Sequence, residues 1–144
     1  MNILVINGPN LSRLDIRDSA IYGNLSYPEL VALITSHAAS LGLSVDIRQS
    51  DDEAQIITWL HEAADANSPV IINPAAFTHY SYAIRDAAEL VKAPLIEVHL
   101  SNPLSREEFR HTSVISGVAD GTIAGFGPNS YLLALEAMRT LLQK

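Results

Sequence analysis

The chain has 144 residues, 48% of them hydrophobic, and carries a net charge of −7. This composition is typical of a globular protein with one domain, here residues 1–144, and the charge has the wrong sign for a general binder of nucleic acids or membrane surfaces. The lack of cysteine excludes thiolate catalysis and cysteine-ligated metal sites. No apolar run approaches the ~20 residues of a membrane helix, and the first ten residues do not resemble a signal peptide, so we expect a cytoplasmic protein.

Strands and helices are expected to alternate along the chain. Short runs of branched apolar residues predict five strands, at residues 3–7, 43–48, 70–72, 94–99 and 121–125. This alternation predicts a parallel sheet covered on both faces. Five strands in a chain of this length favour a flavodoxin-like three-layer α/β sandwich.

The helical patterns lie between these strands. One begins at a capping box in residues 26–29 and stops at Gly42, and the next begins at a second capping box, residues 50–53. Further helices are predicted over residues 80–91 and 130–142.

Polar residues follow several of the strands. Ligands of open α/β sheets bind beyond the carboxyl ends of the strands, so these residues are candidates for a site. They are Asn7, Gly8, Asn10, Asn73, His79, His99, Ser101 and Asn102. Taken singly, many of them are ordinary turn formers. Two histidines and several asparagines at one edge nevertheless favour a binding site.

The connection over residues 8–26 is about three times longer than the usual ~2–6 residues. It contains Arg13, Arg17 and Tyr22, which indicates either a solvated surface loop or a lid that closes over an anion. A second basic cluster holds Arg106 and Arg110, four residues apart, which could share a helical face or belong to a solvated turn.

Two other classes of protein remain open at this point. His79, His99 and His111 could form a zinc site of a metal hydrolase, although no paired metal-ligand spacing supports it. A flavodoxin-like binding module is the other alternative, and a bound flavin would colour the protein yellow.

The sequence resembles the type II 3-dehydroquinate dehydratases from residue 2 to the C-terminal helix. Six segments in the same order carry the resemblance: NGPNL (residues 7–11), R-x4-YG (17–23), INP (72–74), FTHYS with RDA (77–81 and 85–87), EVHLSN (97–102) and REEFRH (106–111). The resemblance implies a flavodoxin-like fold and the reversible loss of water from 3-dehydroquinate to 3-dehydroshikimate. It also implies no cofactor or metal, and a dodecamer built of trimers.

The resemblance also implies a role for each matching residue. Tyr22 is expected to be the base, activated by Arg17, and His99 the acid, oriented by Glu97. Asn10 is expected to hold the water that stabilises the enolate. The expected substrate-binding residues are Asn73, His79, Leu100 through its backbone, Ser101, Arg110 and, from a neighbouring subunit, Asp86.

Four positions depart from the family pattern. Ser12, Asp15 and Ser19 replace residues common in the family's lid, and Ala75 stands where glycine is common. None of them is a proposed proton-transfer residue, so we expect effects on lid mobility rather than on the reaction.

The proposed chemistry agrees with the residue types. A phenol, with an ordinary pKa of about 10, serves as a base at neutral pH only where a cation stabilises its phenolate. A guanidinium ~4 Å away contributes about 4 kcal/mol at an effective dielectric of ~20, close to what three pKa units require. Because desolvation opposes this, a second cation, Arg106 or Arg110, would help. The only lysines, Lys92 and Lys144, are poorly placed for an imine, which favours the enolate route.

Overall fold

The computed structural model describes residues 2–144. Its five strands are β1 (Asn2–Asn7), β2 (Ser44–Gln49), β3 (Val70–Asn73), β4 (Leu95–His99) and β5 (Gly121–Ala124). Every neighbouring pair is parallel, in the order β2-β1-β3-β4-β5. This is the flavodoxin-like order, so the predicted fold class is confirmed.

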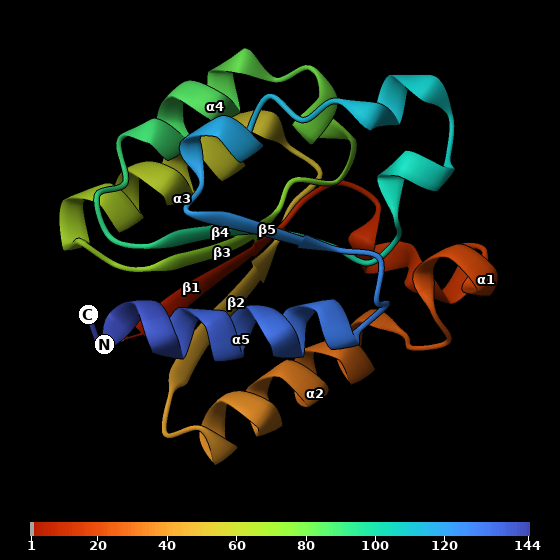
Figure 1. Ribbon diagram of the computed structural model, residues 1–144. Coiled ribbons are helices and arrows are strands. Elements are labelled where there is room, and N and C mark those ends of the chain that lie inside the picture. The colour runs from red at the N-terminus through yellow and green to blue at the C-terminus, as the bar shows by residue number, and fades with distance from the viewer. Residues whose placement is uncertain (1) are drawn as a thin grey trace.

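Two pairs of helices cover the sheet (Figure 1). The helices α2 (Tyr27–Ser40) and α5 (Asn129–Leu142) lie on one face, and α3 (Glu53–Ala66) and α4 (Tyr82–Glu89) lie on the other. Among residues 2–144, none of these helices has the length and apolar character needed to span a bilayer.

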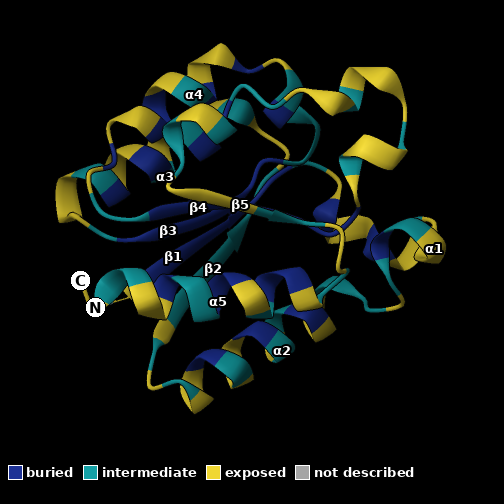
Figure 2. Cartoon of the chain, in the orientation of Figure 1, coloured by how far each residue is buried: buried dark blue, intermediate teal, exposed yellow. Residues whose placement is uncertain are grey.

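Alternation along β1 divides the core into two layers. Ile3 and Val5 pack with α2 and α5, whereas Leu4 and Ile6 pack with α3 and α4. The central strands are therefore buried on both faces, as Figure 2 shows in dark blue. The carboxyl ends of the strands lie at the end of the molecule away from both termini (Figure 1).

Two predicted helix starts are wrong. The helix α3 is capped by Asp52, whose carboxylate accepts from the N–H of Ala54, and not by a capping box at residues 50–53. Glu53 instead accepts a hydrogen bond from Ser81 at 2.6 Å. The helix predicted over residues 80–91 begins only at Tyr82, because the chain first forms a separate 3-10 helix, η2 (Ala75–His79).

The long β1–α2 connection folds into two short helices, η1 (Leu11–Ile16) and α1 (Ser19–Tyr22). Leu11, Leu14 and Tyr22 are buried in the same core layer as α2 and α5. The carboxylate of Asp18 caps α1 at the N–H of Ala20. The interpretation of residues 8–26 as a solvated surface loop is therefore wrong.

Candidate active site

A cavity of about 120 Å³ opens at the carboxyl edge of the sheet. Its walls come from the connection after β1, from β3 with η2, and from β4 with the two short helices that follow it, η3 (Pro103–Ser105) and η4 (Glu108–His111). The predicted residues that line it are Asn10, Arg17, Tyr22, Asn73, His79, His99, Leu100, Ser101 and Arg110.

Close backbone contacts shape the floor of this cavity. A Cβ atom on Gly8 would lie 2.6 Å from the carbonyl oxygen of Pro74, so the turn after β1 can approach the turn after β3 only with glycine there. Ala75 has a φ of 53°, in the left-handed region that glycine adopts without strain. The departure of Ala75 from the family pattern therefore falls on a strained backbone position.

Tyr22 and Arg17 form a contact pair over the cavity. The guanidinium carbon of Arg17 lies 3.6 Å from the centre of the Tyr22 ring, and its Nη2 donates a hydrogen bond to the phenolic oxygen. Burial lowers the pKa of Arg17 from its ordinary value, while the neighbouring Tyr22 opposes this effect. Arginine remains protonated under such conditions, so the pair joins a permanent cation to a phenol.

Two further arginines lie close to this pair. The guanidinium carbon of Arg106 is 5.0 Å from the Tyr22 ring centre, and its Nη1 donates to Ser101 at 3.2 Å. The Nε of Arg106 is buried and has no hydrogen-bond partner among the described residues. Arg110 is paired with Glu107 at 3.0 Å. Three guanidinium groups therefore line one small cavity, which suits an anionic ligand.

His99 and Glu97 form a second pair, at the end of β4. The Nε2 of His99 lies 2.5 Å from Oε2 of Glu97, and the Glu97 side chain is fully buried. This contact fixes the ring, so its other nitrogen, Nδ1, is left for the cavity that His99 lines.

His79 is oriented by the backbone. Its Nδ1 donates to the carbonyl oxygen of Thr112 at 2.8 Å, and its ring meets Phe109 edge-on. Burial lowers the pKa of His79 from its ordinary value. The neutral ring thus keeps Nε2 available to a ligand.

Asn73 belongs to a buried hydrogen-bond chain beneath the cavity. Its Nδ2 donates to the hydroxyl oxygen of Tyr131 at 2.9 Å, and its Oδ1 accepts from the N–H of Ala75 at 3.0 Å. Tyr131 in turn donates to Oδ1 of Asn7 at 2.6 Å. Both partners of Asn73 are fixed, so its amide has one orientation.

The remaining predicted residues differ in their placement. Asn10 lines the cavity with a φ of 70°, and its N–H donates to Asp51 at 2.9 Å. Arg13 pairs with Asp15 at the surface, at 3.2 Å, and does not line the cavity.

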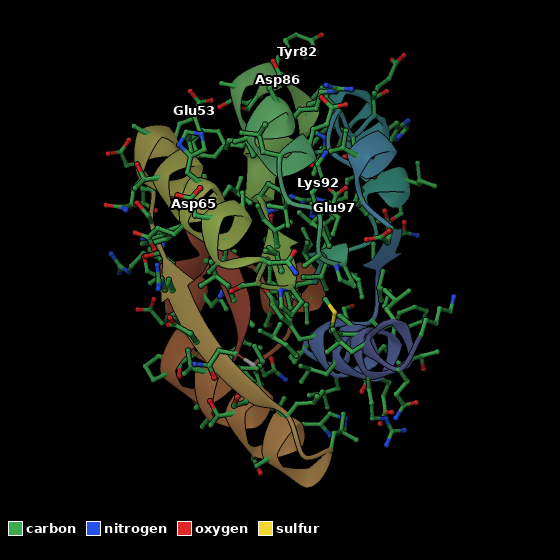
Figure 3. The ribbon with its side chains drawn as sticks, turned by 90° about the vertical axis from the view of Figure 1, so that its left-hand side faces the viewer. Glu53, Asp65, Tyr82, Asp86, Lys92 and Glu97 are labelled. Carbon is green, nitrogen blue, oxygen red and sulfur yellow. The ribbon has the colours of Figure 1, made fainter. Side chains whose placement is uncertain are left out.

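Asp86 lies outside the cavity of its own chain. Its side chain is 72% exposed on α4 and pairs with Arg85 at 2.9 Å. Figure 3 shows Asp86 near Tyr82, on the outer side of the molecule. The spacing of His79, Ala83 and Asp86 along the chain would fit one helical face, but His79 belongs to η2 and the other two belong to α4.

Several supporting residues were missed from the sequence. Thr78, Ser113 and Ser116 donate hydrogen bonds to Glu97, and Tyr131 supports Asn73. Asn7, which was a sequence candidate, accepts from Tyr131. One signal was available: an acidic residue within the apolar strand of residues 94–99 requires buried donors.

Within residues 2–144, no group of three or more His, Cys, Asp or Glu side chains gathers in an arrangement that could hold a metal ion. His111 instead contacts the carbonyl oxygen of Arg106 at 3.1 Å, so the three-histidine arrangement is not formed.

The fold is that of a flavodoxin-like α/β protein, and its cavity combines side chains suited to acid–base chemistry on a small anion. A phenol beside a guanidinium and an imidazole beside a carboxylate line the same cavity. Such a pair of groups can remove one proton and deliver another.

The chain belongs to the class II dehydroquinase family, whose model matches residues 1–139. A protein from Mycobacteroides abscessus named 3-dehydroquinate dehydratase is 56% identical over 135 residues, 94% of each chain. One from Salinispora tropica with the same name is 54% identical over the same share of each chain. The type II dehydroquinase from Propionibacterium acnes superposes with a TM-score of 0.94 at 50% identity, over 96% of each chain.

Proposed function

We propose that this protein is a 3-dehydroquinate dehydratase of type II, which removes water from 3-dehydroquinate to give 3-dehydroshikimate through an enolate. Family membership supports the reaction. The observation that carries the assignment to residues is that Tyr22 with Arg17, and His99 with Glu97, line one cavity rich in arginine.

Tyr22 is the proposed base. Its phenolate takes the proton α to the ketone, and Arg17 stabilises that phenolate through stacking and a hydrogen bond. Arg106, at 5.0 Å from the ring, is the proposed second cation. Asn10 is proposed to hold the water that stabilises the enolate oxygen.

His99 is the proposed acid. It gives a proton to the departing hydroxyl group, which leaves as water, and Glu97 supports the protonated ring. Asn73, His79, Ser101, Arg110 and the Leu100 backbone are the proposed contacts for the hydroxyl and carboxylate groups of the substrate. Their position around one cavity supports this role.

The direct test is a spectrophotometric assay with 3-dehydroquinate as substrate. The product contains a conjugated enone, so turnover appears as a rise in ultraviolet absorbance. A protein that binds this substrate without turning it over would refute the assignment. A purified protein that is yellow would instead favour the flavin-binding alternative.

The biological direction of the reaction is a separate question. Shikimate synthesis for aromatic amino acids is the proposed role, and quinate breakdown is the alternative. Deleting the gene distinguishes them, because loss of a biosynthetic enzyme makes growth depend on added aromatic amino acids. Loss of a catabolic enzyme abolishes only growth on quinate.

We propose that the chain forms a dodecamer of trimers, in which Asp86 reaches the site of a neighbouring subunit. The exposed position of Asp86 beside the exposed Tyr82 supports this proposal. Asp86→Ala is expected to lower turnover and leave the fold of the subunit intact, as measured by the enone assay and circular dichroism. Full activity in a stable monomer would contradict it.

The proposed cytoplasmic location has its own test. Cell fractionation is expected to recover the activity with cytoplasmic marker enzymes.

A further inference from the structure

Glu97 is a carboxylate within the core of the molecule. It lies on β4, labelled in Figure 3, with none of its surface exposed. Among residues 2–144, its one ion-pair partner is His99. A buried carboxylate without an arginine or lysine partner needs hydrogen-bond donors to stay ionised.

Three hydroxyl groups supply these donors. Ser116, which begins η5 (Ser116–Val118), donates to Oε1 of Glu97 at 2.7 Å. Ser113 lies 2.9 Å from Oε1 and 3.1 Å from Oε2. Thr78, in η2, donates to Oε2. With His99, these groups place donors on both oxygens of the carboxylate.

The direction of these hydrogen bonds is fixed by their surroundings. The Ser113 oxygen accepts from the N–H groups of Ile115 and Ser116, at 3.1 and 3.0 Å, so its own proton points to a neighbouring oxygen. The Ser116 oxygen accepts from Thr122 at 3.3 Å, and its own proton points to Oε1 of Glu97. Both acceptor sites of the Ser113 oxygen are taken by backbone N–H groups, so it cannot accept from a protonated Glu97, and the arrangement favours the carboxylate.

The pKa of Glu97 also favours its ionised form. Although burial opposes it, hydrogen bonds from His99, Thr78 and Ser116 hold the pKa of Glu97 below its ordinary value. The other titratable or charged groups around the pair are His79 from η2 and Arg110 and His111 from η4. From β5 and η5, the residues that face it carry hydroxyls and no charge, namely Thr122 and Ser116.

We propose that Thr78, Ser113 and Ser116 are positioning residues for the dehydration, which keep Glu97 ionised so that the catalytic proton resides on His99. The proposal rests on the assignment of His99 as the acid. The Nδ1–H bond of His99 breaks as the C–O bond of the substrate breaks and the O–H bond of water forms. His99 is left neutral, with its Nε2–H still donating a hydrogen bond to ionised Glu97.

The alternative state shows why the hydroxyl groups matter. If the Nε2 proton moved to Glu97, the ring facing the substrate would be a neutral imidazole. An imidazolium is a far stronger proton donor than a neutral imidazole, so turnover would fall. The hydroxyl groups prevent this by stabilising the carboxylate alone.

Ser116→Ala is the cleanest test. Among residues 2–144 the Ser116 hydroxyl hydrogen-bonds only to Glu97 and Thr122, whereas Ser113 also accepts from two backbone N–H groups. Loss of one donor is expected to raise the titration midpoint of the Glu97 carboxyl, followed by ¹³C NMR, by about one pH unit. We expect kcat to fall about tenfold with KM unchanged. Ser116→Thr, which keeps the hydroxyl, should restore both.

Thr122→Val is the matched control. It removes a hydroxyl that contacts Ser116 but not Glu97, so its titration and kcat should stay near those of the unmodified protein. An unchanged Glu97 titration in Ser116→Ala would overturn the proposal, as would an equal effect of Thr122→Val, which would indicate loosened packing. The titration needs no substrate. An unmodified protein that fails to turn over 3-dehydroquinate would therefore refute the proposed function, whatever the titration shows.

Discussion

The two proposed proton-transfer groups are held in different ways. Tyr22 is paired with Arg17, only five residues earlier in the same connection. His99 is held by Glu97, whose other partners are Thr78, from η2, and Ser113 and Ser116, from the segment between η4 and β5. The proposed base is therefore positioned by a neighbour in the same connection, whereas the proposed acid depends on contacts that join distant parts of the packed core.

Tyr22→Phe is expected to have the largest effect, because it removes the phenolic oxygen and keeps the ring that packs with Leu11 and Leu14. Turnover should fall by about 10²–10⁴-fold, the usual effect of losing a general base. Substrate affinity should change far less, since the groups around Asn73 and Arg110 remain. Steady-state assays of the enone product separate kcat from KM. Near-normal turnover at every pH would show that Tyr22 only packs the lid.

Arg17→Ala should lower turnover by about 10- to 100-fold, the effect of removing one hydrogen bond to a charged group. Part of the loss should be recovered as the pH rises, because hydroxide then ionises the phenol without help from a cation. Arg17→Lys is expected to be intermediate, with a point charge in place of the planar fork. The pH profile of kcat for all three proteins is the measurement, and a loss that does not depend on pH would argue for a packing role.

Glu97→Gln tests the acid side through stability. The pKa of Glu97 lies below its ordinary value of 4.5, so the ionised carboxylate stabilises the fold above that pH. This stabilisation is lost as the pH falls through the lowered pKa of Glu97 in the folded protein. At pH 7 we expect the free energy of unfolding of the variant to be about 1–3 kcal/mol lower than that of the unmodified protein. This difference should narrow at acidic pH. Urea titrations at several pH values measure it, and a constant difference would contradict the ionised state.

Ala75→Gly should have the smallest effect, and a favourable one. The left-handed φ of 53° strains alanine, and relief of that strain should raise the free energy of unfolding by about 0.5–1 kcal/mol. Ala76→Gly is the matched control, because this neighbour has no positive φ and should lose stability. Thermal unfolding of both variants checks the prediction, and a gain in both would point away from backbone strain.

The fold was predictable because each strand is marked by the residue types of a short run of the sequence. Branched apolar runs marked all five strands, and β3, for example, extends only one residue beyond its predicted end, to Asn73. The cap of α3 was not predictable in this way, because the Glu53 side chain accepts a hydrogen bond from Ser81, which is 28 residues away in the sequence. Asp52 caps the helix, and the Glu53 side chain is taken up by the contact with Ser81.

The same distinction applies to the candidate site. The residues that line the cavity follow strands or belong to recognisable motifs. His99 was marked by its place after a strand, whereas Tyr22 was marked by the unusually long connection and by the family resemblance. The donors to Glu97 were missed because Ser113 and Ser116 lie in an irregular segment whose path the sequence pattern does not describe. The break between His79 and Tyr82 was missed because the helical pattern continues across it.

The hydrogen-bond chain through Tyr131 gives the cavity a fixed chemical polarity. Since the oxygen of Asn73 is occupied by the N–H of Ala75, the amide cannot turn over, and its second N–H remains for the ligand. A ligand must therefore present an acceptor, such as a hydroxyl or carboxylate oxygen, at that point. An analogue with an N–H or a methyl group there would leave a buried donor unpaired, at a cost of about 1–3 kcal/mol. Selectivity among similar ring compounds thus begins in the buried core, one layer below the atoms that touch the ligand.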